Sequence, residues 1–93
     1  MRAVGRSVAW RGAARQGHAE AVEALLDAGV DVNATYDNQL SALMWAAGQG
    51  HTQVVQALMK RGARDDARDN RGLSASDMAR REGHAAVVAL LGT

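Results

Sequence analysis

The chain contains no cysteine, no proline and no phenylalanine. Without cysteine it can form no disulfide bond and can bind no metal ion through a thiolate. Aromatic residues make up only 3% of the sequence, so alanine, valine and leucine must supply the apolar core. This composition, together with the absence of proline, is typical of a helical protein.

A strong net charge and a long apolar run are also absent. Eleven basic and ten acidic residues leave a formal net charge of +1, which favours neither nucleic acid nor an anionic membrane as a partner. The apolar runs are far shorter than the ~20 residues that a transmembrane helix needs. Residues 1–18 have no continuous apolar core like that of a signal peptide. We therefore expect one small, soluble, cytoplasmic domain with no nucleic-acid or membrane partner.

What the chain does contain is a repeated phrase. GHAEAVEALLDAG at residues 17–29 returns as GHTQVVQALMKRG at residues 50–62, and a shorter copy, GHAAVVALLGT, begins at residue 83. The Gly-His pairs at positions 17, 50 and 83 are equally spaced, and this spacing is the repeat period. The same period separates Ser41 from Ser74, Leu25 from Leu58 and Val22 from Val55. Agreement among several residue types indicates three structural units, none of which can bury its apolar face alone.

Each unit is predicted to contain two helices, and the limits of the first helix can be read from capping residues. Ser41 and Ser74 can accept hydrogen bonds from the first turns of helices that follow them. Gly50 and Gly83 can end those helices in a left-handed conformation.

The second helix is predicted from its apolar spacing. In the middle unit the residues of one helical face are Val54, Val55, Leu58 and Met59. Glycines at 29 and 62 would end the second helices. The segments VDVNATYDNQL and ARDDARDNRGL that follow are rich in Asp, Asn and Gly, which indicates a turn or hairpin.

The period and the phrases SALMWAAGQGH and GHTQVVQALM resemble the ankyrin repeat, whose family pattern reads D-x-x-G-x-T-P-L-H-x-A-A-x-x-G-H. The resemblance extends from about Val8 through the rest of the chain. It implies an all-α ankyrin-repeat solenoid of three helix-turn-helix units with short β-hairpin-like loops between them. The units would span about residues 7–34, 35–67 and 68–93.

The chain also departs from the family pattern. The proline and histidine of the Thr-Pro-Leu-His motif are missing from every unit. Gln39 stands where the family has a turn glycine and Tyr36 where it has an aspartate, whereas Gly72 and Asp69 keep both in the next unit. We therefore expect the ankyrin fold with lower stability than consensus arrays have.

Two clusters of polar residues suggest chemistry at first sight. His18, His51 and His84 lie in a row, but successive units stack about 10 Å apart, so the three cannot share one metal ion. We expect each to form a hydrogen bond locally at the start of a second helix, and we expect no metal and no cofactor.

The second cluster is the turn at residues 64–71, where three aspartates alternate with three arginines. Mixed charges on an exposed turn usually form a solvated, self-compensating surface. The chain has no serine-nucleophile motif, phosphate-binding loop or dinucleotide fingerprint. We therefore expect no catalytic residues and no enzymatic activity.

The resemblance implies a protein partner, bound in a concave groove between the hairpin tips and the exposed face of the first helices. Carried over by position, the binding residues are Arg15, Gln16, Thr35, Tyr36, Asp37, Asn38, Leu40, Trp45, Gln49, Arg68, Asn70, Arg71, Leu73, Arg81 and Glu82. Tyrosine, tryptophan and arginine often anchor interfaces, although Trp45 could instead be half-buried packing and Tyr36 could cover the turn. Arginines 68, 71 and 81 would make one end of the groove basic and suit an acidic or mixed segment.

The resemblance also implies two roles for Asn33, whose neighbours Leu25 and Asp31 fit the family pattern. One is a structural side-chain hydrogen bond across the turn. The other is hydroxylation by an asparaginyl hydroxylase. The structural role is the one we expect, because the equivalent position in the next unit is Asp66.

A second hypothesis is a structural or self-associating scaffold, cut from a larger ankyrin-repeat protein. An exposed N-terminal face carrying Val4, Val8 and Trp10 could pair with a second copy or cover the site of a missing unit. We expect a monomer, with a homodimer through this face as the alternative. An inhibitor of an enzyme is a special case of binding that the sequence does not separate.

Overall fold

The computed structural model describes residues 3–92, and it describes the side chains of residues 9–92 apart from that of Asp37. Within these limits the chain forms the α-helices α1 (Ala3–Gln16), α2 (Ala19–Asp27), α3 (Ala42–Gln49), α4 (Thr52–Lys60), α5 (Ala75–Arg81) and α6 (Ala85–Leu91), with a 3-10 turn η1 (Asp37–Gln39).

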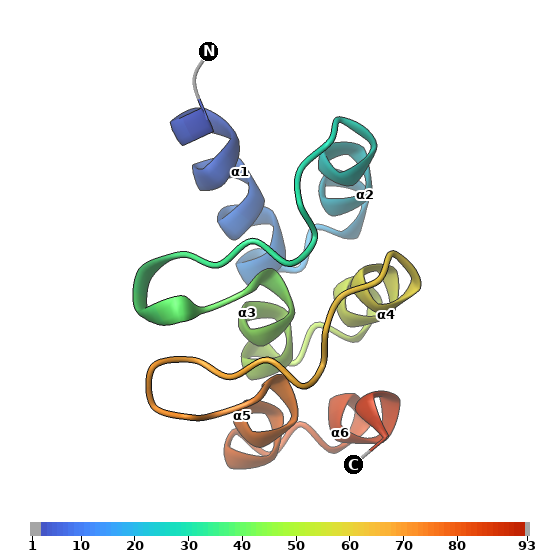
Figure 1. The fold of residues 1–93 in the computed structure, drawn as a ribbon. Coiled ribbons are helices and arrows are strands. Elements are labelled where there is room, and N and C mark those ends of the chain that lie inside the picture. Colours follow the sequence, from blue (N-terminus) through green and yellow to red (C-terminus); the bar gives the residue numbers. More distant parts are fainter. Residues whose placement is uncertain (1–2, 93) are drawn as a thin grey trace.

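The helices are arranged in two parallel columns. Figure 1 shows α1, α3 and α5 stacked in one column and α2, α4 and α6 in the other. The long loops after α2 and α4 project past the column of first helices. The predicted all-α repeat architecture is confirmed.

The predicted capping serines begin the first helices of the second and third units. Ser41 Oγ accepts from the backbone N of Met44 at 3.3 Å, and Ser74 Oγ accepts from that of Asp77 at 3.2 Å. The Asp77 carboxylate accepts from the Ser74 backbone N at 3.0 Å and completes a capping box. In the middle unit the weaker acceptor Met44 Sδ takes that place, at 3.4 Å from Ser41 N.

The glycines end the helices as the repeat predicts. Gly50 caps α3 with a φ of 79°, and Gly83 follows α5 with a φ of 78°. Gly29 and Gly62, with φ of 99° and 91°, follow the second helices α2 and α4. In α4 the buried apolar residues are Val54, Val55, Ala57 and Leu58, and Met59 is half-buried.

Helix α1 is longer than the repeat predicts, because it begins at Ala3 rather than near Val8. Trp10, moreover, is fully buried. The expectation that Trp10 belongs to an exposed N-terminal face is therefore wrong. It lies one repeat period before Leu43 in the sequence, and both side chains belong to the buried core. The side chains of Val4 and Val8 lie outside the described residues.

The core position that holds Trp10 and Leu43 in the first two units holds a polar residue in the third. There it is occupied by Ser76, whose side chain is buried at 6% exposure. The Ser76 hydroxyl accepts a hydrogen bond from Arg80 Nη2 at 3.4 Å. A serine paired with an arginine gives α5 a more polar outer side, as is typical of a capping unit.

The loops between units are not full hairpins. In the described part of the chain the β-pairing consists of a single antiparallel bridge between Thr35 and Ser41. The Tyr36 N donates to the Leu40 O at 3.0 Å, and one unit later Asp69 N donates to Leu73 O at the same distance. These bonds fold both loops alike, so that their tips overhang the first helices.

Candidate functional site: a groove between first helices and loop tips

A groove runs along the first helices beneath the loop tips. It consists of two adjoining hollows, of about 440 Å³ between α1 and α3 and about 450 Å³ between α3 and α5. The first hollow is lined by Arg11, Gly12, Arg15, Gln16, Asn38, Leu40 and Trp45. The second is lined by Leu40, Met44, Trp45, Gly48, Gln49, Arg71, Leu73, Met78, Arg81, Glu82 and His84. The two hollows share Leu40 and Trp45 and therefore form one continuous surface.

Most of the residues proposed from the sequence line this groove. They are Arg15, Gln16, Asn38, Leu40, Trp45, Gln49, Arg71, Leu73, Arg81 and Glu82. Thr35, Tyr36, Arg68 and Asn70 are not among its lining residues, and the side chain of Asp37 lies outside the described residues.

Six lining residues are not among the binding residues proposed from the sequence: Arg11, Gly12, Met44, Gly48, Met78 and His84. Arg11 and Gly12 lie one repeat period before Met44 and Trp45. The repeat register could therefore have placed Gly12 on the groove once Trp45 was assigned to it.

Two arginines of α1 reach across to aromatic rings of the second unit. The guanidinium carbon of Arg15 lies 5.2 Å from the centre of the Trp45 ring, and that of Arg11 lies 5.4 Å from the Tyr36 ring. A guanidinium over an aromatic face is attracted by the ring's negative charge density. Trp45 and Tyr36 therefore serve in packing between units, and Trp45 also lines the groove.

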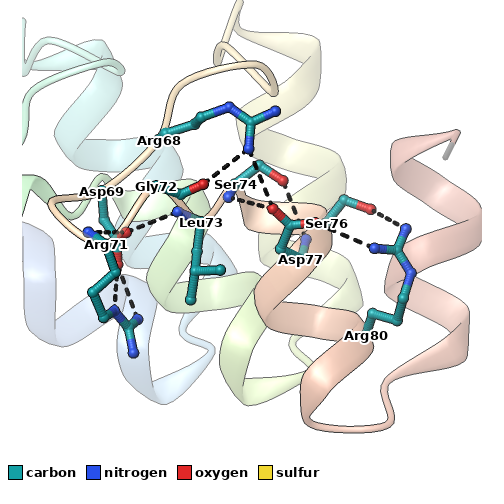
Figure 2. A network of polar contacts seen from close by, with 9 residues as sticks. All are labelled: Arg68, Asp69, Arg71, Gly72, Leu73, Ser74, Ser76, Asp77 and Arg80. Carbon is teal, nitrogen blue, oxygen red and sulfur yellow. Dashed lines mark hydrogen bonds and ion pairs between the residues drawn. The ribbon is translucent and has the colours of Figure 1, made fainter.

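Asp69 holds the loop before α5 in shape. Its side chain is only 1% exposed, so the expectation of a fully solvated cluster of aspartates is wrong for this residue. Its Oδ1 accepts from the backbone N of Arg71 at 2.9 Å and of Leu73 at 3.0 Å, and its Oδ2 accepts from Arg71 Nε at 3.0 Å (Figure 2). Burial raises the pKa of Asp69, but the hydrogen bonds from Leu73 and Arg71 outweigh burial and lower it overall.

The preceding loop has no such anchor, because Tyr36 stands in the place of Asp69. There the turn is made with two residues in the left-handed region, Asn38 at φ 63° and Gln39 at φ 66°. Asparagine tolerates this conformation better than glutamine does. One unit later the second of these positions is Gly72, at φ 82°.

Arg68 turns away from the groove. Its Nη1 donates to the Gly72 backbone oxygen at 2.9 Å and lies 3.4 Å from the Asp77 carboxylate (Figure 2). Asp77 also receives Arg80 Nη1 at 3.3 Å. Hydrogen bonds from the backbone and side chain of Ser74, and the charges of both arginines, lower the pKa of Asp77 despite some burial. Arg68 therefore belongs to a charge network at the start of α5, and it is not one of the groove cations.

Two of the three histidines bridge units. His51 Nε2 lies 2.8 Å from the Arg15 backbone oxygen, and His84 Nε2 lies 3.1 Å from that of Gly48. The expectation of local bonds is wrong for these two and is confirmed for His18, which lies 3.2 Å from Gln16 Oε1. A carbonyl can only accept, so the Nε2 of His51 and of His84 carries the proton.

The bridging rings also require glycine above them. A Cβ built on Gly17 would lie 2.7 Å from His51 Nδ1, and one on Gly50 would lie 2.7 Å from His84 Nδ1. Both glycines have a positive φ as well, at 80° and 79°. The glycine of one Gly-His pair therefore packs against the histidine of the next pair, and this contact joins neighbouring units.

Asn33 forms a second link between units. Its Nδ2 donates to the Gly62 backbone oxygen at 3.2 Å, and its Oδ1 accepts from the Arg64 backbone N at 2.8 Å. The expected structural role is confirmed, and its bonds reach into the turn of the next unit.

The described residues include no group of three or more His, Cys, Asp or Glu side chains that could hold a metal ion. None of the described helices has both the length and the apolarity that crossing a membrane would require.

Comparison with known families agrees with this architecture. A family model described as ankyrin repeats in three copies matches residues 11–92. The match begins within α1 and takes in all five of the following α-helices. No curated protein matches the chain.

Proposed function

Because the chain belongs to the ankyrin repeat family, we propose that it is a protein–protein interaction module that holds its partner in the groove described above. Ankyrin repeats are generally protein–protein interaction modules. The observation that carries the proposal is the make-up of the groove, in which the partly exposed apolar side chains of Leu40, Trp45 and Leu73 lie beside exposed arginines. Apolar and aromatic anchors within a polar rim are typical of binding surfaces.

The titratable groups support binding rather than catalysis. Among the described groups, a shifted pKa is found at Asp69, Asp77 and Arg61. Hydrogen bonds to Asp27 and Glu23 raise that of Arg61, against burial. Perturbed groups at a catalytic site converge in a pocket, whereas these hold loops and helix ends in place. We propose that the protein has no enzymatic activity.

The test is affinity capture from a lysate of the native source. The wild-type chain is compared with the groove variant Leu40→Asp, Arg81→Glu, after circular dichroism has shown that both are folded. A matched control, Gln53→Glu with Gln56→Glu, carries two new charges on the exposed side of α4. A protein retained by wild type and control but lost by the groove variant supports the proposal. A protein lost only by the control would place binding on the second helices and overturn it.

We also propose that the module acts as a monomer. Trp10, the large side chain that self-association through the N-terminal face would use, is fully buried. Light scattering over a range of concentrations tests this directly. A stable dimer would overturn this proposal and favour the self-associating scaffold instead.

A further inference from the structure

We infer that the groove binds a short acidic segment of the partner, which inserts one apolar side chain beside Gly48. This inference rests on the proposed function and adds the chemistry of the partner to it. Three features carry it: a glycine that neither backbone conformation nor packing requires, apolar side chains in the lining next to that glycine, and a surplus of arginine around the groove.

Gly48 lies in the last turn of α3, and its φ is not among the positive values found at the turn glycines. A Cβ at this position would meet Met78 Cβ at 3.9 Å, which is ordinary van der Waals contact. Glycine weakens a helix relative to alanine. The structural effect of Gly48 is therefore to leave open a space that any other residue would fill.

The repeat shows what that space would otherwise contain. Positions 15, 48 and 81 are equivalent, and they hold Arg15, Gly48 and Arg81. In the first hollow Arg15 lies across the ring of Trp45. In the second hollow Gly48 has no side chain to lay across Met78, so the recess between α3 and α5 stays open.

Apolar side chains make up part of the lining of this recess: those of Leu40, Met44, Trp45, Leu73 and Met78. Trp45 and Leu73 are half-buried, and Met78 is buried, at 8% exposure. Gln49 is exposed on the wall, with an amide that can both donate and accept. An inserted leucine, isoleucine or methionine would gain apolar contacts while its backbone remained within reach of that amide.

The charges around the recess are mainly positive. Arg15, Arg71 and Arg81 line the groove, whereas Glu82 is the single acid among its described lining side chains. Arg71 is paired with Asp69 at 2.9 Å. No described carboxylate forms an ion pair with Arg15 or Arg81, and both are exposed. Carboxylates of a partner on either side of the inserted residue would complement these two guanidiniums.

The experiment is a selection of random dodecapeptides displayed on phage against the wild-type chain. Enriched peptides are then synthesised, and their Kd is measured for wild type and variants. We expect a single large apolar residue flanked by Asp or Glu. Arg81→Gln should weaken binding about two- to fivefold, with a smaller effect at high salt because of screening.

The decisive variant is Gly48→Leu, whose side chain would occupy the recess. We expect it to weaken peptide binding at least about fivefold, as over-filling of a packed space does. Its thermal midpoint should not fall, because leucine is the better helix former. The matched control is Gln56→Leu, which adds a leucine on the exposed side of α4, outside the groove. It should leave the Kd within about twofold.

The outcomes separate the two proposals. If the enriched peptides are neutral or basic and Gly48→Leu weakens their binding, the inference is overturned and the proposed groove function still holds. Peptides that bind all groove variants as tightly as wild type overturn both, whereas a selection without enrichment overturns the inference alone. A wild-type dimer that Gly48→Leu dissociates would assign the recess to a second copy and overturn the inference.

Discussion

The imidazole of His51 reaches from the second unit to the backbone oxygen of Arg15 in the first, with 2.8 Å between Nε2 and O. His84 repeats the contact one unit later, on Gly48. The carbonyls of Arg15 and Gly48 lie in the last turns of α1 and α3, where no partner within the helix is available. Each histidine therefore satisfies a helix end in the preceding unit.

The first prediction concerns this bridge. His51→Ala should lower the free energy of unfolding by about 1–2 kcal/mol, because it leaves a helix-terminal carbonyl without its donor. The urea midpoint should fall with an unchanged m value. His18→Ala is the matched control, since its bond to Gln16 is local and exposed, and its effect should stay within about 0.5 kcal/mol. Equal losses in the two variants would contradict the prediction.

The second prediction concerns the amide of Asn33, which both donates to Gly62 and accepts from Arg64. Asn33→Ala should destabilise the chain by about 1–2 kcal/mol, measured by urea unfolding. Asp66 stands at the same position one unit later and is exposed. Asp66→Ala should therefore change stability by less than about 0.5 kcal/mol. If Asp66→Ala costs as much, the bridge to the next unit is not the cause.

The third prediction exchanges the turn residues of the two loops. Gln39 and Gly72 are equivalent, and both have a positive φ, of 66° and 82°. A side chain in this region costs about 1–2 kcal/mol. Gly72→Gln should therefore destabilise by about that amount. Gln39→Gly should stabilise by a smaller amount, about 0.5 kcal/mol, because glycine also gains freedom in the unfolded chain. The thermal midpoints of the two variants should shift in opposite directions from that of wild type. Shifts in the same direction would argue against backbone strain at Gln39.

The fourth prediction is a dependence of stability on pH. The pKa values of Asp69 and Asp77 are lowered in the folded protein. Their contribution to stability is therefore fully present above the ordinary aspartate pKa of about 3.9. It is lost as the pH falls below that value and through the lowered pKa values. Urea midpoints between about pH 6 and pH 2 should follow this course. Asp69→Asn and Asp77→Asn should each flatten it, whereas a slope equal to that of wild type in both would refute the assignment.

The helices were predictable because their signals are local. Ser41 and Gly50 mark the two ends of α3 in the sequence itself, and the structure uses both as caps. The groove was largely predictable as well, because the repeat register transfers positions from one unit to the next. The limits of the units themselves remain predictions.

Contacts between distant residues were not predictable in this way. The partner of His51 lies 36 residues away, in a unit whose relation to it only the stacked structure reveals. Arg68 was assigned to the groove from its place on the loop, but the carboxylate of Asp77 draws it to the start of α5. Asp69 was expected in solvent, but its side chain is buried and its carboxylate accepts hydrogen bonds from three donors of its own loop.

The bonds that join the units also limit how the length of the chain can change. Asn33 bonds to Gly62, and His51 bonds to Arg15, so an insertion within α3 or within the first residues after α2 would shift one partner against the other. The exposed tip at Asn38 and Gln39 lies between Asn33 and α3, where extra residues would loop out at the expense of the bonds between Asn38 and Asn70 but not of these two. Insertions or deletions should be tolerated at this tip, or as whole repeat units that carry their own histidine and glycine with them.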